Sequence, residues 1–316
     1  MTNYWKKRQQ QLNKALETSE REVRRRLYRV YKAEALRLQH QIDGYYARYG
    51  VNGVLRYRDM KRKLTAAEAD LLYRDVYAFQ RLHPECPIEI VTSIYELDRL
   101  EGLQTSVLLQ SAELGLVEEA EVRAHLESMA ALGANETAEA LGRGLYTERS
   151  DIIQTIVNKK WSNGENFSGR IWTNREKLAR TLNTQIAQSL ARGDARAKIV
   201  RNVSKRFQDV SIKNIDRLVY TEGTYIMNES QAAVLEDTFT YYKLAPINDN
   251  KTCPFCHDVE DETEALPVKF EEREPGVNFP PLHPWCRCTF DIIIPDRMEF
   301  MRNYTGINVE DFIDEA

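Results

Sequence analysis

The sequence predicts a mainly α-helical protein with a small α+β module near its C-terminal end. Residues 4–49 contain almost no helix breaker before Gly44, and helical patterns continue to about residue 236. The segments 238–245 and 289–294 are instead rich in β-branched and aromatic residues, which is typical of strands. Four of the five cysteines lie between these two segments, so we expect a metal ion to staple a β-hairpin-like end.

The first long helix carries one narrow apolar stripe, whose members are spaced by four, seven, four and three positions: Leu12, Leu16, Val23, Leu27 and Val30. A helix of this length gains most of its stability from packing. We therefore expect it to lie against a partner helix, either of the same chain or of another subunit.

Three capping boxes predict where further helices begin. In this motif a Ser or Thr side chain accepts from the backbone N–H three residues on, and a Glu there reaches back. The boxes at 65–68, 93–96 and 173–176 predict helices that end near Leu82, Leu114 and Arg192.

Glycines and prolines predict the interruptions. Two prolines in residues 83–87 forbid a helix, and Gly193 is expected to stop the helix before it. We expect the middle to break into short helices at three glycines: Gly133, Gly142 and Gly144. Two more helices are expected at 194–207 and 212–236.

A loop rich in Gly, Ser and Asn at residues 161–172 marks the expected main domain boundary. The sequence thus predicts a helical region at 1–160, a Cys/His-bearing module at 161–295 and an acidic tail at 296–316. The chain has no apolar run of about 18 residues and its first residues lack an apolar signal region, so neither a membrane span nor secretion is predicted.

The net charge of −4 is the sum of a basic N-terminal region and an acidic C-terminal region. Residues 1–63 carry 17 Lys and Arg against 6 Asp and Glu, whereas residues 249–316 carry 6 against 16. This polarity suggests that the two ends face different partners. The basic end can meet nucleic acid or an acidic protein, or it can simply be a solvated helix face.

The late cysteines have the spacing of a metal site: Cys-x2-Cys, then 26 residues, then His-x2-Cys-x-Cys. Six donors are available: Cys253, Cys256, His257, His283, Cys286 and Cys288. A tetrahedral Zn²⁺ needs four. Cys253 and Cys256 form one knuckle, and His257 points away from it. The spacing does not decide which of His283, Cys286 and Cys288 complete the set.

A site filled by protein ligands would be structural rather than catalytic. The alternatives are a disulfide formed on oxidation, or buried reduced thiols. Near the cluster, Arg287 can offset the negative charge of the thiolates, or it can bind the carboxylate of Asp249 through two parallel hydrogen bonds. Glu222, on the preceding helix with Arg217, can pack on the strands or lie on the surface.

The usual catalytic patterns are absent from the sequence. We find no Gly-rich phosphate loop, no His-Glu-x-x-His and no nucleophile elbow. His40, His83 and His125 are isolated and are interpreted as surface or packing residues. The sequence therefore predicts a protein that is not an enzyme and has no small-molecule substrate.

Three segments carry a resemblance to a known family. Residues 217–222 read Arg-x-x-x-Thr-Glu, residues 249–256 read Asp-x-x-Thr-Cys-x-x-Cys, and residues 280–288 end in His-Pro-x-Cys-Arg-Cys. This pattern resembles the Mu F-like head morphogenesis family of tailed bacteriophages. The chain departs from it at Tyr220, where the family often has arginine, and in the acidic residues 258–264. Neither departure affects a candidate ligand.

The resemblance implies a minor head, or minor capsid, protein that is present in few copies. Its expected partners are the portal protein and the capsid interior, and its expected roles are head assembly and DNA packaging, retention or ejection. Such a protein lies in the virion near the portal, and in the host cytoplasm during assembly. The alternative is a DNA-binding protein that uses the basic N-terminal helix and a zinc knuckle. In either case packaged DNA is the expected partner of that helix.

Overall fold

The computed structural model describes residues 3–90, 93–144, 150–247, 249–250 and 252–293. The expected acidic tail at 296–316 lies outside the described residues. None of the helices in the described part is long and apolar enough to cross a membrane.

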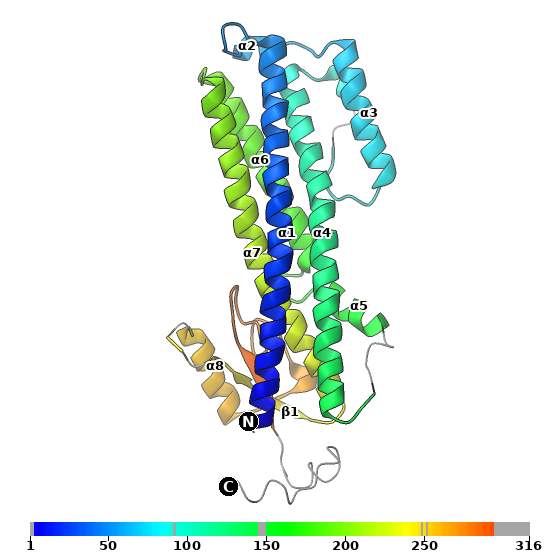
Figure 1. Cartoon of the computed structure of the whole chain (residues 1–316), viewed down its shortest axis with the longest axis vertical. Coiled ribbons are helices and arrows are strands. Elements are labelled where there is room, and N and C mark those ends of the chain that lie inside the picture. The colour runs from blue at the N-terminus through cyan, green and yellow to red at the C-terminus, as the bar shows by residue number, and fades with distance from the viewer. Residues whose placement is uncertain (1–2, 91–92, 145–149, 248, 251, 294–316) are drawn as a thin grey trace, which may run out of the picture. The chain divides into compact units, whose positions relative to one another are not determined.

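Helices dominate the described residues (Figure 1). In chain order the elements are α1 (Asn3–Tyr49), α2 (Tyr57–Met60), α3 (Ala66–Leu82), the 3₁₀ turn η1 (Ile94–Glu96), α4 (Arg99–Ala140), α5 (Ser150–Asn158), α6 (Phe167–Ala191), α7 (Arg196–Leu235), β1 (Tyr241–Ala245), α8 (Pro254–Ala265), β2 (Val268–Lys269), η3 (Phe270–Glu272) and β3 (Thr289–Ile292). The predicted fold class, mainly α with a small C-terminal α+β module, is confirmed.

The described residues form two compact units. The first consists of residues 3–23, 122–167 and 217–293, and the second of residues 24–121 and 168–216. The helices α1, α4 and α7 contribute residues to both units. The domain boundary expected before residue 161 stays a prediction.

The apolar stripe of α1 is buried as expected except at Val30, which is only partly buried because the buried face passes through Tyr31. Leu12, Leu16, Val23 and Leu27 are all at most 8% exposed, and the same spacing continues through Tyr31, Ala35, Leu38 and Ile42. In the second unit α1 lies against α4 of its own chain. The Tyr31 hydroxyl donates a hydrogen bond to the buried carboxylate of Glu118 on α4.

Only one of the three expected capping boxes is present. Thr65 caps α3 with Glu68, as predicted. Ser93 instead begins the single turn η1 and makes no side-chain cap. The box that opens α4 joins Asp98 and Glu101, each accepting from the backbone N–H of the other. Thr173 lies inside α6, so the third box is wrong.

Two of the expected interruptions are also wrong. Gly133 lies inside α4, where a Cβ would collide with Ser230 and Met227 of α7. It therefore allows two helices to approach closely. The helices expected at 194–207 and 212–236 are one continuous helix, α7. Gly193 does end α6 as predicted, with φ of 70°.

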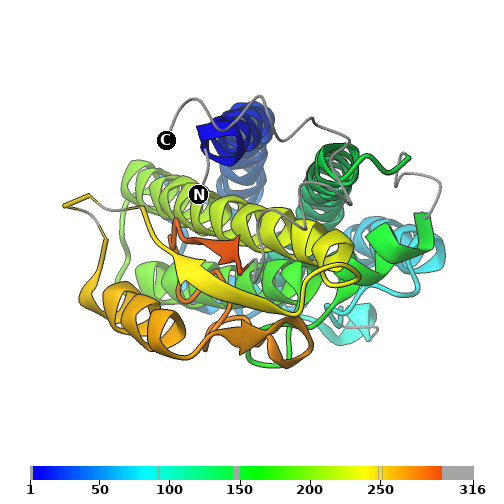
Figure 2. The same ribbon diagram turned by 90° about the horizontal axis from the view of Figure 1, so that it is seen from below.

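The sheet of the first unit has the order β2–β1–β3 and is antiparallel throughout. Figure 2 shows β1 between its two neighbours, with α8 beyond. The short strand β2 was not predicted. An aromatic cluster on this sheet packs against Ala232, Val234 and Leu235 of α7; its rings are Phe239, Tyr242, Phe270, Phe279 and Phe290.

Candidate metal centre

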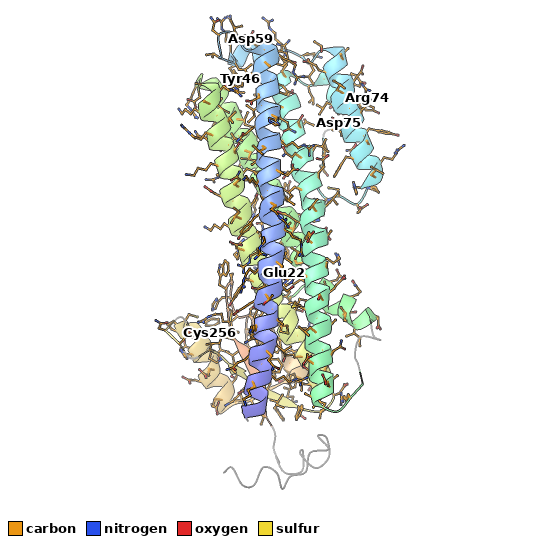
Figure 3. The ribbon with its side chains drawn as sticks, viewed as in Figure 1. Glu22, Tyr46, Asp59, Arg74, Asp75 and Cys256 are labelled. Carbon is orange, nitrogen blue, oxygen red and sulfur yellow. The ribbon has the colours of Figure 1, made fainter. Side chains whose placement is uncertain are left out.

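The first cysteine pair is set by the beginning of α8. Cys253 is the N-cap residue, Pro254 occupies the first helical position and the N–H of Cys256 donates to the Cys253 carbonyl at 3.1 Å. Proline suits this position because its fixed φ is already helical. Residues three apart in this turn share a face, so both thiols point the same way. Figure 3 labels Cys256 at the first turn of α8.

The second group of donors comes from the turn that leads into β3. The N–H of Cys286 donates to the His283 carbonyl at 3.1 Å, and Trp285 between them has φ of 67°. The turn aims His283 and Cys286 toward α8. Cys288 lies immediately before β3.

These donors converge. The Sγ atoms of Cys253 and Cys256 are 3.5 Å apart, and each lies 3.2 Å from Nε2 of His283. The Sγ atoms of Cys256 and Cys286 are 4.0 Å apart. Two groups share Cys256: one adds Cys253 and His283, and the other adds Cys286 and Cys288. All four cysteines are free thiols.

The distances can be tested against a tetrahedral zinc ion. Zn–S bonds of about 2.3 Å and Zn–N bonds of about 2.05 Å place two sulfurs about 3.8 Å apart and sulfur and nitrogen about 3.6 Å apart. The observed separations of 3.2–4.0 Å fall within a few tenths of these values. The group of Cys253, Cys256 and His283, together with the Cys256–Cys286 pair, therefore has the separations that such an ion needs, while the five donors form two groups rather than one.

The imidazole of His283 is oriented for binding through Nε2. Its Nδ1 lies 2.8 Å from the carbonyl oxygen of Pro284, which can only accept a hydrogen bond. Nδ1 therefore carries the proton and the lone pair of Nε2 faces the two thiols. Such a hydrogen bond on the distal nitrogen is the usual way that a ligating histidine is held.

Burial makes the cluster an unfavourable place for thiolates alone. Cys256, Cys286 and Cys288 are at most 3% exposed and pack with Leu244, Val259 and Leu282. Burial raises the pKa of Cys256 to about 12, while the hydrogen bond from Cys288 lowers the pKa of Cys286 to about 5. A divalent cation would replace the remaining protons and balance the charge of the thiolates.

Two further contacts hold the knuckle loops. The guanidinium of Arg287 donates to both carboxylate oxygens of Asp249, at 2.6 and 2.8 Å. The hydroxyl of Thr263 accepts from the backbone N–H of Leu244, which ties α8 to β1. His257 turns away and pairs with Glu260 at 3.1 Å, so it is not brought to the cluster.

The helix α7 supports the second turn from behind. Thr221 accepts from the N–H of Trp285 at 3.3 Å, and Asn228, two turns further on, lies 3.4 Å from the carbonyl of Cys288. The carboxylate of Glu222 accepts from the indole of Trp161 rather than from the strand backbone. Arg217 is exposed on the same helix.

The sequence does not indicate one feature of this region, the buried ion pairs around Glu229. Glu229 on α7 is 2% exposed and accepts from both Lys159 and Arg273, at 2.8 and 3.2 Å. Thr221, Glu222, Asn228 and Glu229 are all buried polar residues of α7. In the sequence these residues form two pairs that are each seven positions apart, Thr221 with Asn228 and Glu222 with Glu229. This spacing places each pair on one side of the helix, but it is equally typical of a helix face in solvent.

Comparison with known proteins identifies the segment that holds this geometry. Residues 180–291 match the family described as Phage Mu protein F like protein. This segment is thus similar to the Mu F-like family. It contains the Thr221–Glu222 pair and every candidate metal ligand. No curated protein and no solved structure matches the chain.

The Mu F-like match confirms the resemblance seen in the sequence. The matched family indicates a phage head morphogenesis protein with a place in the virion. The match covers residues 180–291 only, so the long N-terminal helices are described by the structure alone.

Proposed function

We propose that this chain is a non-enzymatic minor head protein of a tailed phage, with a structural zinc ion in its Mu F-like segment. The observation that carries the proposal is the convergence of one imidazole and four thiols from the beginning of α8 and the turn before β3. Zinc bound by four protein ligands leaves no position for substrate. The metal would supply folding free energy to a module with a small apolar core.

The ligand set that the distances support best is Cys253, Cys256, His283 and Cys286. The first three donors lie within 3.5 Å of one another, and Cys286 approaches Cys256. Cys288 then remains a neighbour whose thiol donates to Cys286. Zinc here would tie the beginning of α8 to the turn before β3.

We further propose that the protein acts at the portal vertex and the capsid interior, assisting head assembly and DNA packaging, retention or ejection. The match to the Mu F-like family supports this placement. Mass spectrometry of purified virions and procapsids tests it, with tail-only fractions as the control. Absence of the protein from both particles would overturn the proposal.

DNA contact is a second candidate, and the structure favours a different surface for it than α1. Many arginines of α1 form ion pairs within the chain, including Arg8 with Glu136 and Arg26 with Glu121. Residues 168–216 instead carry eleven Lys and Arg against four Asp and Glu. Within the second unit, Lys177, Arg201, Lys205 and Arg206 make no ion pair with any described residue.

A polar groove lies on this surface. It has a volume of about 470 Å³ and is lined by Arg180, Thr181, Thr184, Gln185, Gln188 and Arg206. Cationic and hydroxyl side chains along a groove suit a phosphate backbone. Binding of duplex DNA that falls with salt, and falls more in Arg201→Glu/Arg206→Glu than in Arg25→Glu/Lys32→Glu, would support this role. Equal losses in the two variants would refute it.

A further inference from the structure

Three segments near the Cys/His cluster, two loops and the first turn of α8, each expose one large apolar side chain. Ile247 follows β1, Phe255 adjoins Cys256, and Trp285 adjoins Cys286. These side chains are 41%, 47% and 46% exposed, although Phe255 and Trp285 each adjoin a buried cysteine. Exposed large apolar side chains on neighbouring segments are typical of an interaction surface.

The backbone conformation of Trp285 supports the interpretation of these side chains as an interaction surface. Its φ of 67° lies in the left-handed region, which a bulky side chain rarely adopts. Glycine or asparagine takes this conformation with less strain. The contact that the fold gives the indole is a tilted ring pair with Tyr220 at 5.2 Å. The fold thus tolerates a strained tryptophan whose side chain remains half exposed.

An acidic stripe continues from Phe255 along α8. Asp258 and Glu262 follow Phe255 at three and seven positions, so the three residues share one helix face. Asp258, Asp261 and Glu262 are exposed and make no ion pair with any residue that the structure describes. Residues 241–293 carry ten Asp and Glu against five Lys and Arg.

We propose that these residues form a docking surface for a protein segment in which Lys or Arg side chains flank an apolar one. We call it the knuckle face, defined by Ile247, Phe255, Asp258, Glu262 and Trp285. Phe255 and Trp285 would receive the apolar side chain, and the stripe on α8 would pair with the cations. The negative charge opposes nucleic acid and anionic membranes. The inference goes beyond the proposed function, since it names a surface and the chemistry of its partner.

Peptide binding to the full-length protein tests the inference. The probe is a short amphipathic helical peptide of Leu and Lys, and its counterpart has Glu in place of each Lys. We expect the Lys peptide to bind and the Glu peptide not to bind. Phe255→Ser and Asp258→Lys/Glu262→Lys should each weaken binding by about tenfold or more, as loss of an interface anchor does. Glu89→Lys/Asp209→Lys, with the same change in charge at exposed sites of the second unit, should leave binding unchanged.

Trp285→Asn separates a binding role from a structural one. The variant should weaken peptide binding by about tenfold without lowering the Tm, because asparagine relieves the left-handed strain. All five candidate ligands are retained, so zinc content reports separately on the metal centre. A clear fall in Tm would show that Trp285 is needed by the fold and would overturn its role as an anchor.

Three other outcomes would overturn the proposal as a whole. One is equal binding of the two peptides, and another is equal loss in the control variant. The third is self-association in sedimentation that the Lys peptide displaces, which would make a second copy of the chain the occupant. None of these results bears on whether the protein is a head component.

Discussion

At the scale of single residues, Cys288 is the donor that distinguishes the possible ligand sets. Its thiol is buried beside Cys256 and Cys286, and its hydrogen bond makes Cys286 the most acidic thiol of the cluster. We expect Cys288→Ser to retain zinc, because a serine hydroxyl can still donate to the Cys286 thiolate. Cys253→Ser, Cys256→Ser, His283→Ala and Cys286→Ser should each lose most of it.

Elemental analysis of freshly purified, reduced protein measures this difference. Cys86→Ser is the matched control, since Cys86 lies in the second unit and is a free thiol away from the cluster. Loss of zinc from Cys288→Ser with retention by His283→Ala would instead assign an all-cysteine site.

The ion pairs of Glu229 should make the free energy of unfolding of the first unit depend on pH. Burial raises its pKa, but Arg273 and Lys159 more than offset this and leave the pKa below its ordinary value. A carboxyl whose folded pKa is depressed stabilises the fold above its unfolded pKa, near 4.3, and loses this contribution as pH falls through the folded value.

Arg273→Met should therefore destabilise the first unit by about 3 kcal/mol at neutral pH, because it leaves a buried carboxylate with one exposed cation. The variant's deficit should shrink as the pH falls below the depressed pKa, where Glu229 is protonated in both proteins. Urea unfolding at pH 7 and near pH 3 measures both values. An equal deficit at the two pH values would show that packing of the arginine stem is what matters.

At the scale of elements, the glycines of α4 show why local rules failed. Glycine disfavours a helix interior, so Gly133 was predicted to end one. The structure places it where α4 and α7 approach each other too closely for a Cβ. Tertiary contacts of this kind are not visible in the local sequence. The same holds at Thr173, whose capping pattern is overridden because α6 begins earlier, at Phe167.

Gly133→Ala should consequently destabilise the protein, although alanine is the better helix former. We expect a loss of about 1–3 kcal/mol from overpacking against Ser230 and Met227. Gly144→Ala is the control, since a Cβ there meets nothing within 4 Å. Thermal unfolding of the two variants compares them. If Gly133→Ala were as stable as the control, the close approach of α4 and α7 would not be required.

At the scale of the whole molecule, the parts that sequence could predict are those with strong local signals. The stripe of α1, the Thr65 cap, the Gly193 stop and the strands β1 and β3 are of this kind. The cysteine spacing likewise singles out the five residues that the structure brings together as candidate donors. It could not find Asn228, Thr263 or Arg273, because their roles depend on chain segments brought together by folding.

The same reasoning predicts how the molecule responds to metal removal. The helix α8 and the turn before β3 depend on one small apolar cluster and on the donors that zinc would join, whereas the sheet packs its aromatic cluster on α7 and the long helices bury long stripes. Chelation should therefore open residues 253–265 and 280–288 and spare most of the helical signal. Hydrogen exchange with and without chelator would show faster exchange confined to these residues, and far-ultraviolet circular dichroism would change little. Added Zn²⁺ should restore protection, but not in Cys256→Ser. Uniform loss of protection along α7 as well would mean that the helices depend on the metal centre, and the staple would then support the whole first unit.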